Sequence, residues 1–437
     1  MSEKVRLFIG NIFHSPEKLQ VQLLEGGFVA VKDRKIIAVG DADALKNELN
    51  RFENEYDVEK VTLKASQVLV PGFVDTHIHA PQYPNCGLGY DKTLLDWLNL
   101  YTFELERKYR DLELAEKVFD SVVKKSIEHG TTTACYFGSL FADATIVLAD
   151  AVEKYGQRAL VGKINMTQCT FDDYRETEQE SLDNTIRFVE NVLSRKNDLV
   201  QPIITPRFAL SVDIEHMTKL SEIAKTYDLH IQSHVSENKD EIALIHDIYD
   251  LPYAEVYDKA NILTKKTVLA HGIYLSDDEL KLILERDTAI SHCPDSNTCI
   301  KSGLCDVRRF MECGIKVGLG TDISGGFSPS IRQAMKSALD VSIHISFNRD
   351  NYEPLTYKDV FYLATLGGAE ALAMDDKIGN FEPGKEFDAL IIDVDIKDGQ
   401  IDYLIDCSPW EVLQKFIYSG DDRNILEVYV SGRKLKG

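Results

Sequence analysis

The sequence predicts an α/β protein, a (β/α)8 TIM-type barrel with a small β-sandwich-like domain formed from both termini. Short apolar runs alternate with amphipathic helical patterns between residues 68 and 322, which is typical of a parallel sheet with helical crossovers. There are eight of these runs, the number that closes a barrel. Most of them end in ionisable side chains, and barrel enzymes carry their chemistry at the C-terminal ends of the strands.

The eight predicted strands follow one another in a regular order. They are VLVPGFVDTHIH, TTACYFG, ALVGKINM, PIITPRFAL, HIQSHVSE, TVLAHGIY, TAISHCP and KVGLGTD. The helical pattern LELAEKVFDSVVKKSIEHG precedes the second strand, and MTKLSEIAKTYD precedes the fifth. The loop after the first strand is long, and we expect its DKTLLDWLNLYTFELE segment to cover the barrel mouth, because long loops in compact domains are often lids.

The two ends of the chain contain short strand patterns separated by turn signals. VRLFIGNIF, FVAVKDRKIIAVG and VTLKASQVLV lie at the N-terminal end, and FDALIIDVDI and ILEVYVSGRKLKG at the C-terminal end. We therefore predict that residues 1–70 form the N-terminal part of the small β domain. Residues 71–380 form the barrel, and residues 381–437 complete the small domain.

Composition and charge exclude several classes of protein. The 437 residues are 44% apolar and 27% charged, a globular balance that excludes a disordered or fibrous chain. Lys and Arg number 49 against 71 Asp and Glu, and the net charge of −22 disfavours nucleic acid and anionic membranes as partners. No stretch approaches the roughly 20 apolar residues of a membrane helix, and no signal-peptide pattern is visible. We expect a cytoplasmic protein whose eight cysteines are free thiols.

Three histidines and an aspartate at strand ends form a candidate metal site. His77 and His79 are two residues apart in a strand, so their imidazoles project from the same face. His234 ends the fifth strand, and Asp322 follows the Gly-rich eighth strand. Each residue alone has an ordinary structural explanation, as a packed core histidine or a turn aspartate. Together, three imidazole nitrogens and one carboxylate suit Zn²⁺ or Fe²⁺ better than Ca²⁺ or Mg²⁺.

Several motifs carry a family resemblance that runs in order over almost the whole chain. They are PGFVDTHIHAPQY, LLDWLNLYTFELE, TTTACYFG, TPRF, HIQSHVSEN, LAHG, SHCPDSN, GLGTDISGG, ATLGGAEAL and GDDRNI. In these segments the sequence resembles the amidohydrolase superfamily and, within it, the guanine deaminase (guanine aminohydrolase) branch. Asp295 in SHCPDSN departs from the pattern, because relatives usually carry an uncharged polar residue there.

The resemblance implies an activity and a role for each candidate residue. The expected reaction is hydrolytic deamination of guanine to xanthine and ammonia, with one zinc ion on His77, His79, His234 and Asp322. Glu237 would carry a proton to the purine ring and His271 would stabilise the attacking water, with Asp322 accepting its proton. The substrate contacts implied are Gln82, Arg207, Phe208 and, from the lid, Trp97. Family members are typically homodimers, so a homodimer is expected.

The chemistry of these side chains is consistent with the implied reaction. Zinc lowers the pKa of bound water towards about 7, so hydroxide becomes available to attack C2 of guanine. A carboxylic acid at Glu237 can protonate N3 as charge develops there. The guanidinium of Arg207 can donate to the C6 carbonyl, and the same donors would meet the amine of adenine unpaired. Phe208 and Trp97 also fit simple core packing, and Gln82 also fits a hydrogen-bonded loop residue.

Two alternative functions remain open at the level of sequence. The first is another one-metal deaminase or a chlorohydrolase that acts on a different heterocycle, such as a pterin or triazine. The second is a non-catalytic scaffold of the same fold, which the retained metal ligands and Glu237 disfavour. Lys163 lies in the middle of its run rather than at a strand end, so a second, lysine-bridged metal is not expected. We expect His292 to shape the pocket wall and not to bind the metal.

Overall fold

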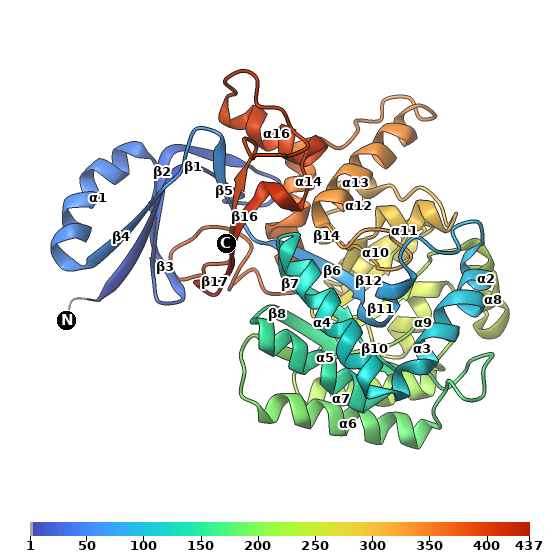
Figure 1. Cartoon of the computed structure of the whole chain (residues 1–437). Coiled ribbons are helices and arrows are strands. Elements are labelled where there is room, and N and C mark those ends of the chain that lie inside the picture. The colour runs from blue at the N-terminus through green and yellow to red at the C-terminus, as the bar shows by residue number, and fades with distance from the viewer. Residues whose placement is uncertain (1–2) are drawn as a thin grey trace.

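A computed structural model describes residues 3–437, and its centre is a parallel barrel (Figure 1). The eight barrel strands are β6 (Phe73–His79), β7 (Thr131–Phe137), β8 (Arg158–Gly162), β10 (Val200–Pro206), β11 (His230–Val235), β12 (Thr267–His271), β13 (Ala289–His292) and β14 (Val317–Leu319). They pair in this order, each parallel to the next, and the short strand β9 (Ile164–Asn165) pairs with β10. Past the end of β14, Asp322 N donates to His77 O at 2.8 Å and His79 N donates to Ile323 O at 3.2 Å. These two bonds join the last strand region to the first, so the predicted barrel is confirmed.

Helices connect the strands and surround the barrel. They are α4 (Leu112–Glu128), α5 (Ala142–Tyr155), α6 (Glu178–Ser194), α7 (Ile214–Thr226), α8 (Lys239–Tyr249), α9 (Tyr253–Lys259), α10 (Asp277–Glu285), α11 (Pro294–Cys299) and α12 (Val307–Glu312). After β14 come α13 (Ile331–Ser346), α14 (Tyr357–Ala364), α15 (Leu366–Ala371) and α16 (Pro409–Ser419). α4 and α7 match the two helical patterns quoted from the sequence. Their apolar faces pack onto the strands, which buries Phe119 of α4 and Leu220 of α7 completely.

The segment between β6 and α4 is built from short helical turns over the barrel mouth. They are η1 (Ala80–Asn85), α2 (Leu94–Trp97), η2 (Leu98–Thr102), α3 (Phe103–Glu106) and η3 (Arg107–Arg110). η2 is a single π-helical turn between α2 and α3. Such turns interrupt α-helices and are frequent at functional sites. This is the segment that the sequence predicts as a lid.

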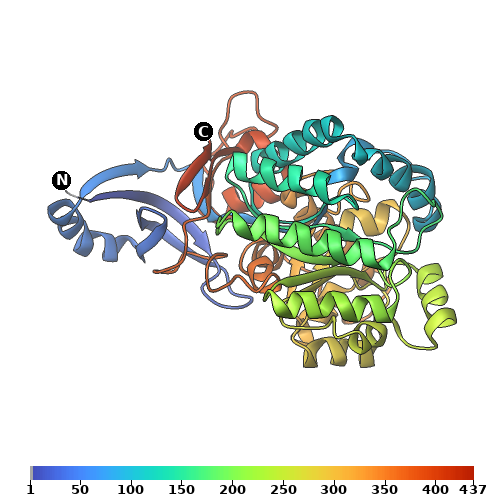
Figure 2. The same ribbon diagram turned by 90° about the horizontal axis from the view of Figure 1, so that it is seen from below.

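A second sheet is formed by both ends of the chain. Its strands are β1 (Lys4–His14), β2 (Gln22–Lys32), β3 (Lys35–Gly40), β4 (Asp57–Thr62), β5 (Gln67–Pro71), β15 (Ala389–Asp393), β16 (Ile425–Val430) and β17 (Arg433–Lys436). They run in the order β17-β16-β15-β5-β1-β2-β3, with β4 on β1. Figure 2 shows this sheet extending to one side of the barrel with α1 (Ala42–Glu55) packed against it. The predicted small β domain from both termini is thus confirmed, and its strands share one hydrogen-bonded sheet.

The chain changes sheets inside a run that reads as one strand in the sequence. Residues 68–79 contain the end of β5, which pairs with β15, and all of β6, which pairs with β7. Only Gly72 separates them, and a Cβ atom there would lie 2.1 Å from Thr132 Oγ1. Glycine at position 72 therefore permits the close approach of the chain to Thr132 of β7. The boundaries predicted after residues 70 and 380 stay predictions.

A buried ion network joins the barrel to the terminal sheet. Arg158, the first residue of β8, donates to Glu386 Oε2 at 2.8 Å and to Asp388 Oδ1 and Oδ2 at 3.2 Å. Asp388 Oδ1 also accepts from the backbone N of Ser431 at 2.7 Å, and Glu386 Oε1 from Arg34 at 2.9 Å. These contacts pair the buried charge of Arg158 with carboxylates of the other domain.

All eight cysteines are free thiols. Within residues 3–437, no helix has both the length and the apolar character required to cross a bilayer.

Candidate active site

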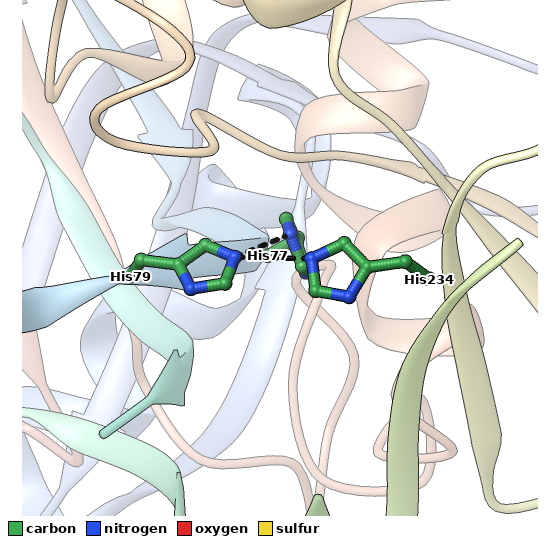
Figure 3. Close-up of side chains that lie close together, drawn as sticks. All are labelled: His77, His79 and His234. Atoms are coloured by element: carbon green, nitrogen blue, oxygen red, sulfur yellow. Dashed lines mark hydrogen bonds between the residues drawn. The ribbon is translucent and has the colours of Figure 1, made fainter. Parts of the chain in front are cut away.

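The imidazoles of three histidines meet at the C-terminal ends of β6 and β11. His77 and His79 project from the same face of β6, and His234 projects from β11 (Figure 3). His79 Nε2 lies 3.2 Å from His77 Nε2 and 3.1 Å from His234 Nε2. The Nδ1 of His234 is 2.5 Å from the backbone oxygen of Arg207, so it carries the proton and leaves Nε2 as a free lone pair.

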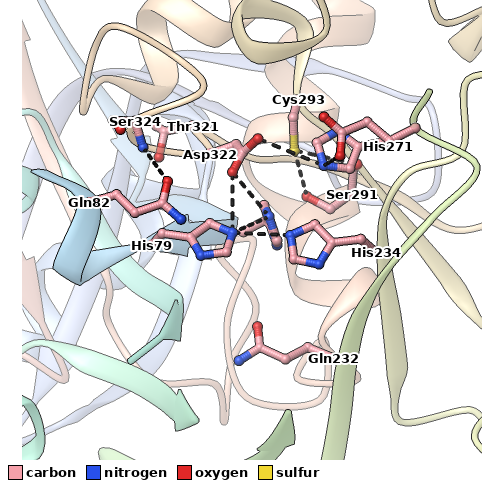
Figure 4. A network of polar contacts seen from close by, with 12 residues as sticks. His79, Gln82, Gln232, His234, His271, Ser291, Cys293, Thr321, Asp322 and Ser324 are labelled. Atoms are coloured by element: carbon pink, nitrogen blue, oxygen red, sulfur yellow. Dashed lines mark hydrogen bonds and ion pairs between the residues drawn. The ribbon is translucent and has the colours of Figure 1, made fainter. Parts of the chain in front are cut away.

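Asp322 adds a carboxylate to the three nitrogens. Its Oδ1 lies 3.2 Å from His77 Nε2 and 3.4 Å from His79 Nε2 (Figure 4). Four ligand atoms placed tetrahedrally at zinc–nitrogen distances of about 2.0–2.1 Å are about 3.3 Å apart. The observed separations of 3.1 to 3.4 Å therefore fit a single ion between these groups. Nitrogen atoms that face one another without an ion would gain little, because two imidazoles at this distance can share only one proton.

Burial keeps the imidazoles in the form that binds metal. It lowers the pKa of His77 to about 3, and it lowers the pKa values of His79 and His234 well below their ordinary value, helped by the neighbouring histidines. The imidazoles are thus neutral near pH 7. Metal ligands must be deprotonated to bind, so the donor set is ready for a cation. The same burial raises the pKa of Asp322, and a cation at this point would offset that effect.

Glu237 and His271 lie side by side next to this cluster. His271 Nε2 is 3.3 Å from Glu237 Oε2 and 3.7 Å from Asp322 Oδ2. The other ring nitrogen of His271, Nδ1, lies 2.8 Å from Asn297 Oδ1 and donates to it. Nε2 is then an acceptor that finds no hydrogen-bond partner among residues 3–437. Burial, and then the charges of Asp322 and Glu241, raise the pKa of Glu237 well above its ordinary value.

Gln82 and Arg207 also line the cavity, and both are held by hydrogen bonds to other residues of the protein. Gln82 Oε1 accepts from the backbone N of Ser324 at 3.2 Å, and its Nε2 donates to Glu106 Oε1 at 2.9 Å. Arg207 directly follows β10 rather than lying within it. Its Nη1 donates to Glu106 Oε2 at 2.5 Å and its Nη2 to Glu106 Oε1 at 3.3 Å.

One cavity brings the predicted residues together. Its lining residues are His79, Gln82, Leu94, Trp97, Leu98, Arg207, Phe208, His234, Glu237, His271, Ile300 and Asp322. Trp97 donates its ring N–H to Leu88 O at 3.0 Å, so only its apolar ring remains for a ligand. Of the predicted metal ligands, catalytic groups and substrate contacts, all but His77 line this cavity, and His77 contacts His79 and Asp322. His292, which was expected to shape the pocket wall, is not among the lining residues.

Some residues of the site were not predicted from the sequence. Glu106 and Tyr174 hold the substrate side, and Tyr174 donates to Glu106 Oε2 at 2.6 Å. Asn297 holds the tautomer of His271. Glu106 ends the LLDWLNLYTFELE motif, which also contains Asp96 and Glu104, so its charge does not distinguish it in the sequence. Tyr174 lies in the polar stretch FDDYRET, which contains no such signal.

Three residues that were set aside in the sequence lie outside the cluster of metal-binding groups. Lys163 pairs with Glu176 behind the strands, where both are buried. His292 is buried, its pKa is lowered to about 3 by burial, and its ring is not part of the metal-binding groups found in residues 3–437. Asp295 accepts from Ser337 Oγ at 2.5 Å and so turns away from the cavity towards α13.

Neutral imidazoles, a carboxylate and a buried acid at the C-terminal end of a parallel barrel define a metal-dependent hydrolase. The sequence model of the Amidohydrolase family matches residues 68–435. The chain belongs to the amidohydrolase family.

Individual relatives lie in one branch of this family. The chain is 44% identical to a guanine deaminase of Mus musculus, over 98% of this chain and 96% of the relative. It is 33% identical to a guanine deaminase of Escherichia coli (strain K12), over 96% and 93%. The crystal structure of a guanine deaminase from C. acetobutylicum, with bound guanine in the active site, superposes with a TM-score of 0.88 at 35% identity, covering 98% of this chain and 99% of that one. The resemblance seen in the sequence motifs is confirmed.

Proposed function

We propose that this chain hydrolyses guanine to xanthine and ammonia, with one zinc ion held by His77, His79, His234 and Asp322. The observation that carries the proposal is that one buried cavity presents two chemistries together. Metal-binding groups and an acid line it together with hydrogen-bonding groups suited to a purine. The activity named for the relatives supports the same substrate.

Zinc, when bound, supplies hydroxide at neutral pH by lowering the pKa of water. Asp322 accepts the proton that the water loses, and His271 holds the water through its free Nε2. Glu237, protonated because it is buried, donates to N3 of the ring as electron density moves there. The proton taken by Asp322 goes to the amine at C2, which leaves as ammonia, and the hydroxyl proton at C2 returns to Glu237 as the carbonyl of xanthine forms. One water is consumed, the C–N bond breaks and a C–O bond forms, so the atoms balance.

Four other residues of the cavity are proposed to recognise the guanine base. Arg207 offers hydrogen-bond donors alone, which suits the C6 carbonyl of guanine and not the C6 amine of adenine. Gln82 offers both a donor and an acceptor to the mixed edge of a purine. Phe208 and Trp97 provide apolar faces for the ring.

The finer expectations from the sequence belong to the same proposal. Zinc is proposed as the ion from the family resemblance, and three imidazole nitrogens with one carboxylate suit Zn²⁺ or Fe²⁺. Residues 71–380 are proposed as the catalytic domain, flanked by 1–70 and 381–437. A cytoplasmic homodimer is proposed from the family resemblance.

A substrate screen tests this function. Zinc-loaded protein is incubated with guanine, adenine, cytosine and pterins, and ammonia is measured together with the purine product. We expect ammonia and xanthine from guanine, and loss of both after chelation. Ammonia from adenine, cytosine or a pterin but not from guanine would overturn the substrate assignment, and no ammonia from any of them would favour a scaffold.

A further inference from the structure

We propose that Glu106 is a positioning residue that fixes Gln82 and Arg207 to read the C6 carbonyl of a purine. Glu106 is the last residue of α3 in the lid, and none of its side chain is exposed. Its carboxylate accepts four hydrogen bonds, two from Arg207, one from Gln82 and one from Tyr174. Both candidate recognition residues are therefore held by one group. The inference rests on the proposed function, which supplies the purine.

The bond to Glu106 decides which way the amide of Gln82 points. Nε2 must face the carboxylate, and Oε1 must face the backbone N–H of Ser324. A reversed amide would place two donors against each other at Ser324 and two acceptors against each other at Glu106. One Nε2 hydrogen and one Oε1 lone pair stay free for a ligand. Gln82 thus presents its donor and its acceptor in a fixed order.

The same carboxylate fixes the plane of Arg207. Two of the five N–H donors are used by Glu106, and the Phe103 ring lies under the guanidinium with its centroid 4.9 Å from Cζ. Three donors remain, and the buried guanidinium has no freedom to turn them elsewhere. Buried donors that meet no acceptor are costly, so a ligand with a carbonyl at this position is favoured over one without it.

The position of Glu106 also ties recognition to the lid. Leu94, Trp97 and Leu98 precede Glu106 in the same segment, and all three line the cavity. The bonds from Glu106 reach Gln82 after β6 and Arg207 after β10, so the lid closes on the same side chains that read the ligand. A purely structural Glu106 would neutralise Arg207 and would have no effect on which purine binds.

Two ligands separate the positioning role from a structural one. Hypoxanthine keeps the C6 carbonyl and lacks the amine that leaves, and purine lacks both. Calorimetric titration of the zinc-loaded full-length protein gives Kd for each ligand. We expect the wild type to prefer hypoxanthine by at least about tenfold, from hydrogen bonds that purine cannot make.

Three variants complete the experiment. Glu106→Asp keeps the charge beside Arg207 but withdraws the carboxylate by one methylene, and Glu106→Gln removes the charge. Both are expected to reduce the preference for hypoxanthine to within about threefold, with a nearly unchanged Kd for purine. Glu104→Gln on the same helix, whose carboxylate is an exposed partner of Arg107, is the matched control and should keep the wild-type preference.

The outcomes distinguish the inference from the function it rests on. Loss of the buried charge in Glu106→Gln can destabilise the fold, so Tm and zinc content are measured for each variant, and Glu106→Asp decides if Glu106→Gln unfolds. A wild type without preference, or folded variants that keep it, would overturn the positioning role. Variants that lose fold and zinc together with the preference would assign Glu106 to folding alone. Failure of the wild type to release ammonia from guanine would instead refute the proposed function.

Discussion

Glu237 combines burial with a position beside the metal-binding groups. Its carboxyl is 3.3 Å from His271, and burial raises its pKa well above the ordinary value, which favours the protonated form that general acid catalysis needs. The imidazole of His271 is neutral, because burial lowers its pKa to about 4. It is therefore not a cation that would favour the ionised form of Glu237.

Glu237→Gln is predicted to lower kcat for guanine by about 10²–10⁴-fold, because the amide keeps the shape but has no proton to transfer. Zinc content should remain near one ion per chain, since Glu237 is not among the four metal-binding side chains. Ammonia release and metal analysis on the same preparation check this. Turnover within about threefold of wild type would refute the proton-transfer role.

The sequence predicted that His77 and His79 lie together, but it did not predict the contact between Glu106 and Tyr174. His77 and His79 are two residues apart in a strand, and strand geometry alone brings them together. Glu106 and Tyr174 are 68 residues apart and meet only through the fold. Their contact depends on how the lid segment turns, which no local pattern specifies. A positioning residue of this kind is therefore visible only in three dimensions.

The N-terminus of α8 shows how one element supports the acid. Asn238 caps the helix, and Glu241 Oε2 accepts from the backbone N of Glu237 at 3.2 Å and from that of Asn238 at 3.3 Å. Glu241 Oε1 accepts from Tyr253 at 2.6 Å. Burial is the main cause that raises the pKa of Glu241 from 4.5 to about 7. Between about pH 4.5 and 7, the carboxyl of Glu241 is thus protonated in the folded state and ionised in the unfolded chain.

This shift has a definite sign for stability. Because the pKa of Glu241 is higher in the folded state than in the unfolded chain, its contribution to the free energy of unfolding is fully present below pH 4.5. This contribution is lost as pH rises to about 7. Glu241→Gln mimics the protonated form and lacks this loss. The free energy of unfolding of the variant, relative to wild type, should therefore increase by about 2 kcal/mol between pH 5 and pH 8.

Urea unfolding at the two pH values measures this difference, and α6 provides a control. Glu180 forms the capping box of α6 with Thr177, but it is exposed and hydrogen bonds to Thr177 lower its pKa. It is ionised at both pH values, so Glu180→Gln should show no change of this kind. An equal pH dependence in the two variants would contradict the role given to burial.

At the level of elements, periodicity predicted the barrel better than the terminal domain. α4 and α7 follow from regular apolar spacing, whereas α1 was not predicted. Its N-cap, Asp41, accepts from the backbone N of Asp43 and Ala44, and Phe52 is its one fully buried residue. The helix is amphipathic, but most of its residues are polar or charged, so it was not recognised between the strand patterns on either side. The split of residues 68–79 between two sheets was also missed, because both strands are buried and read as one apolar run.

The whole molecule depends on the junction between the barrel and the terminal sheet. Arg158 is 4% exposed and pairs with Glu386 and Asp388 across this junction. Arg158→Met leaves the buried carboxylate of Asp388 without a cation and Glu386 with Arg34 alone, which is predicted to lower the free energy of unfolding by about 3–5 kcal/mol. Denaturant unfolding measures the loss.

An exposed ion pair provides the comparison for this variant. Arg187 and Asp143 are 50% and 61% exposed, so solvent already screens their attraction. Arg187→Met should therefore destabilise the protein far less than Arg158→Met. Similar losses for the two variants would show that the junction does not depend on its buried charges.

The barrel as a whole brings the ends of two strands, β6 and β11, and the loop after β14 to a single cation. The central claim is that one metal ion at His77, His79, His234 and Asp322 is required for deamination of guanine. The direct measurement is to remove metal with a chelator and return zinc in small steps while following xanthine formation. The rate is predicted to rise linearly and to level off at about one zinc per chain. Full activity in metal-free protein, or a break at two ions per chain, would contradict the account.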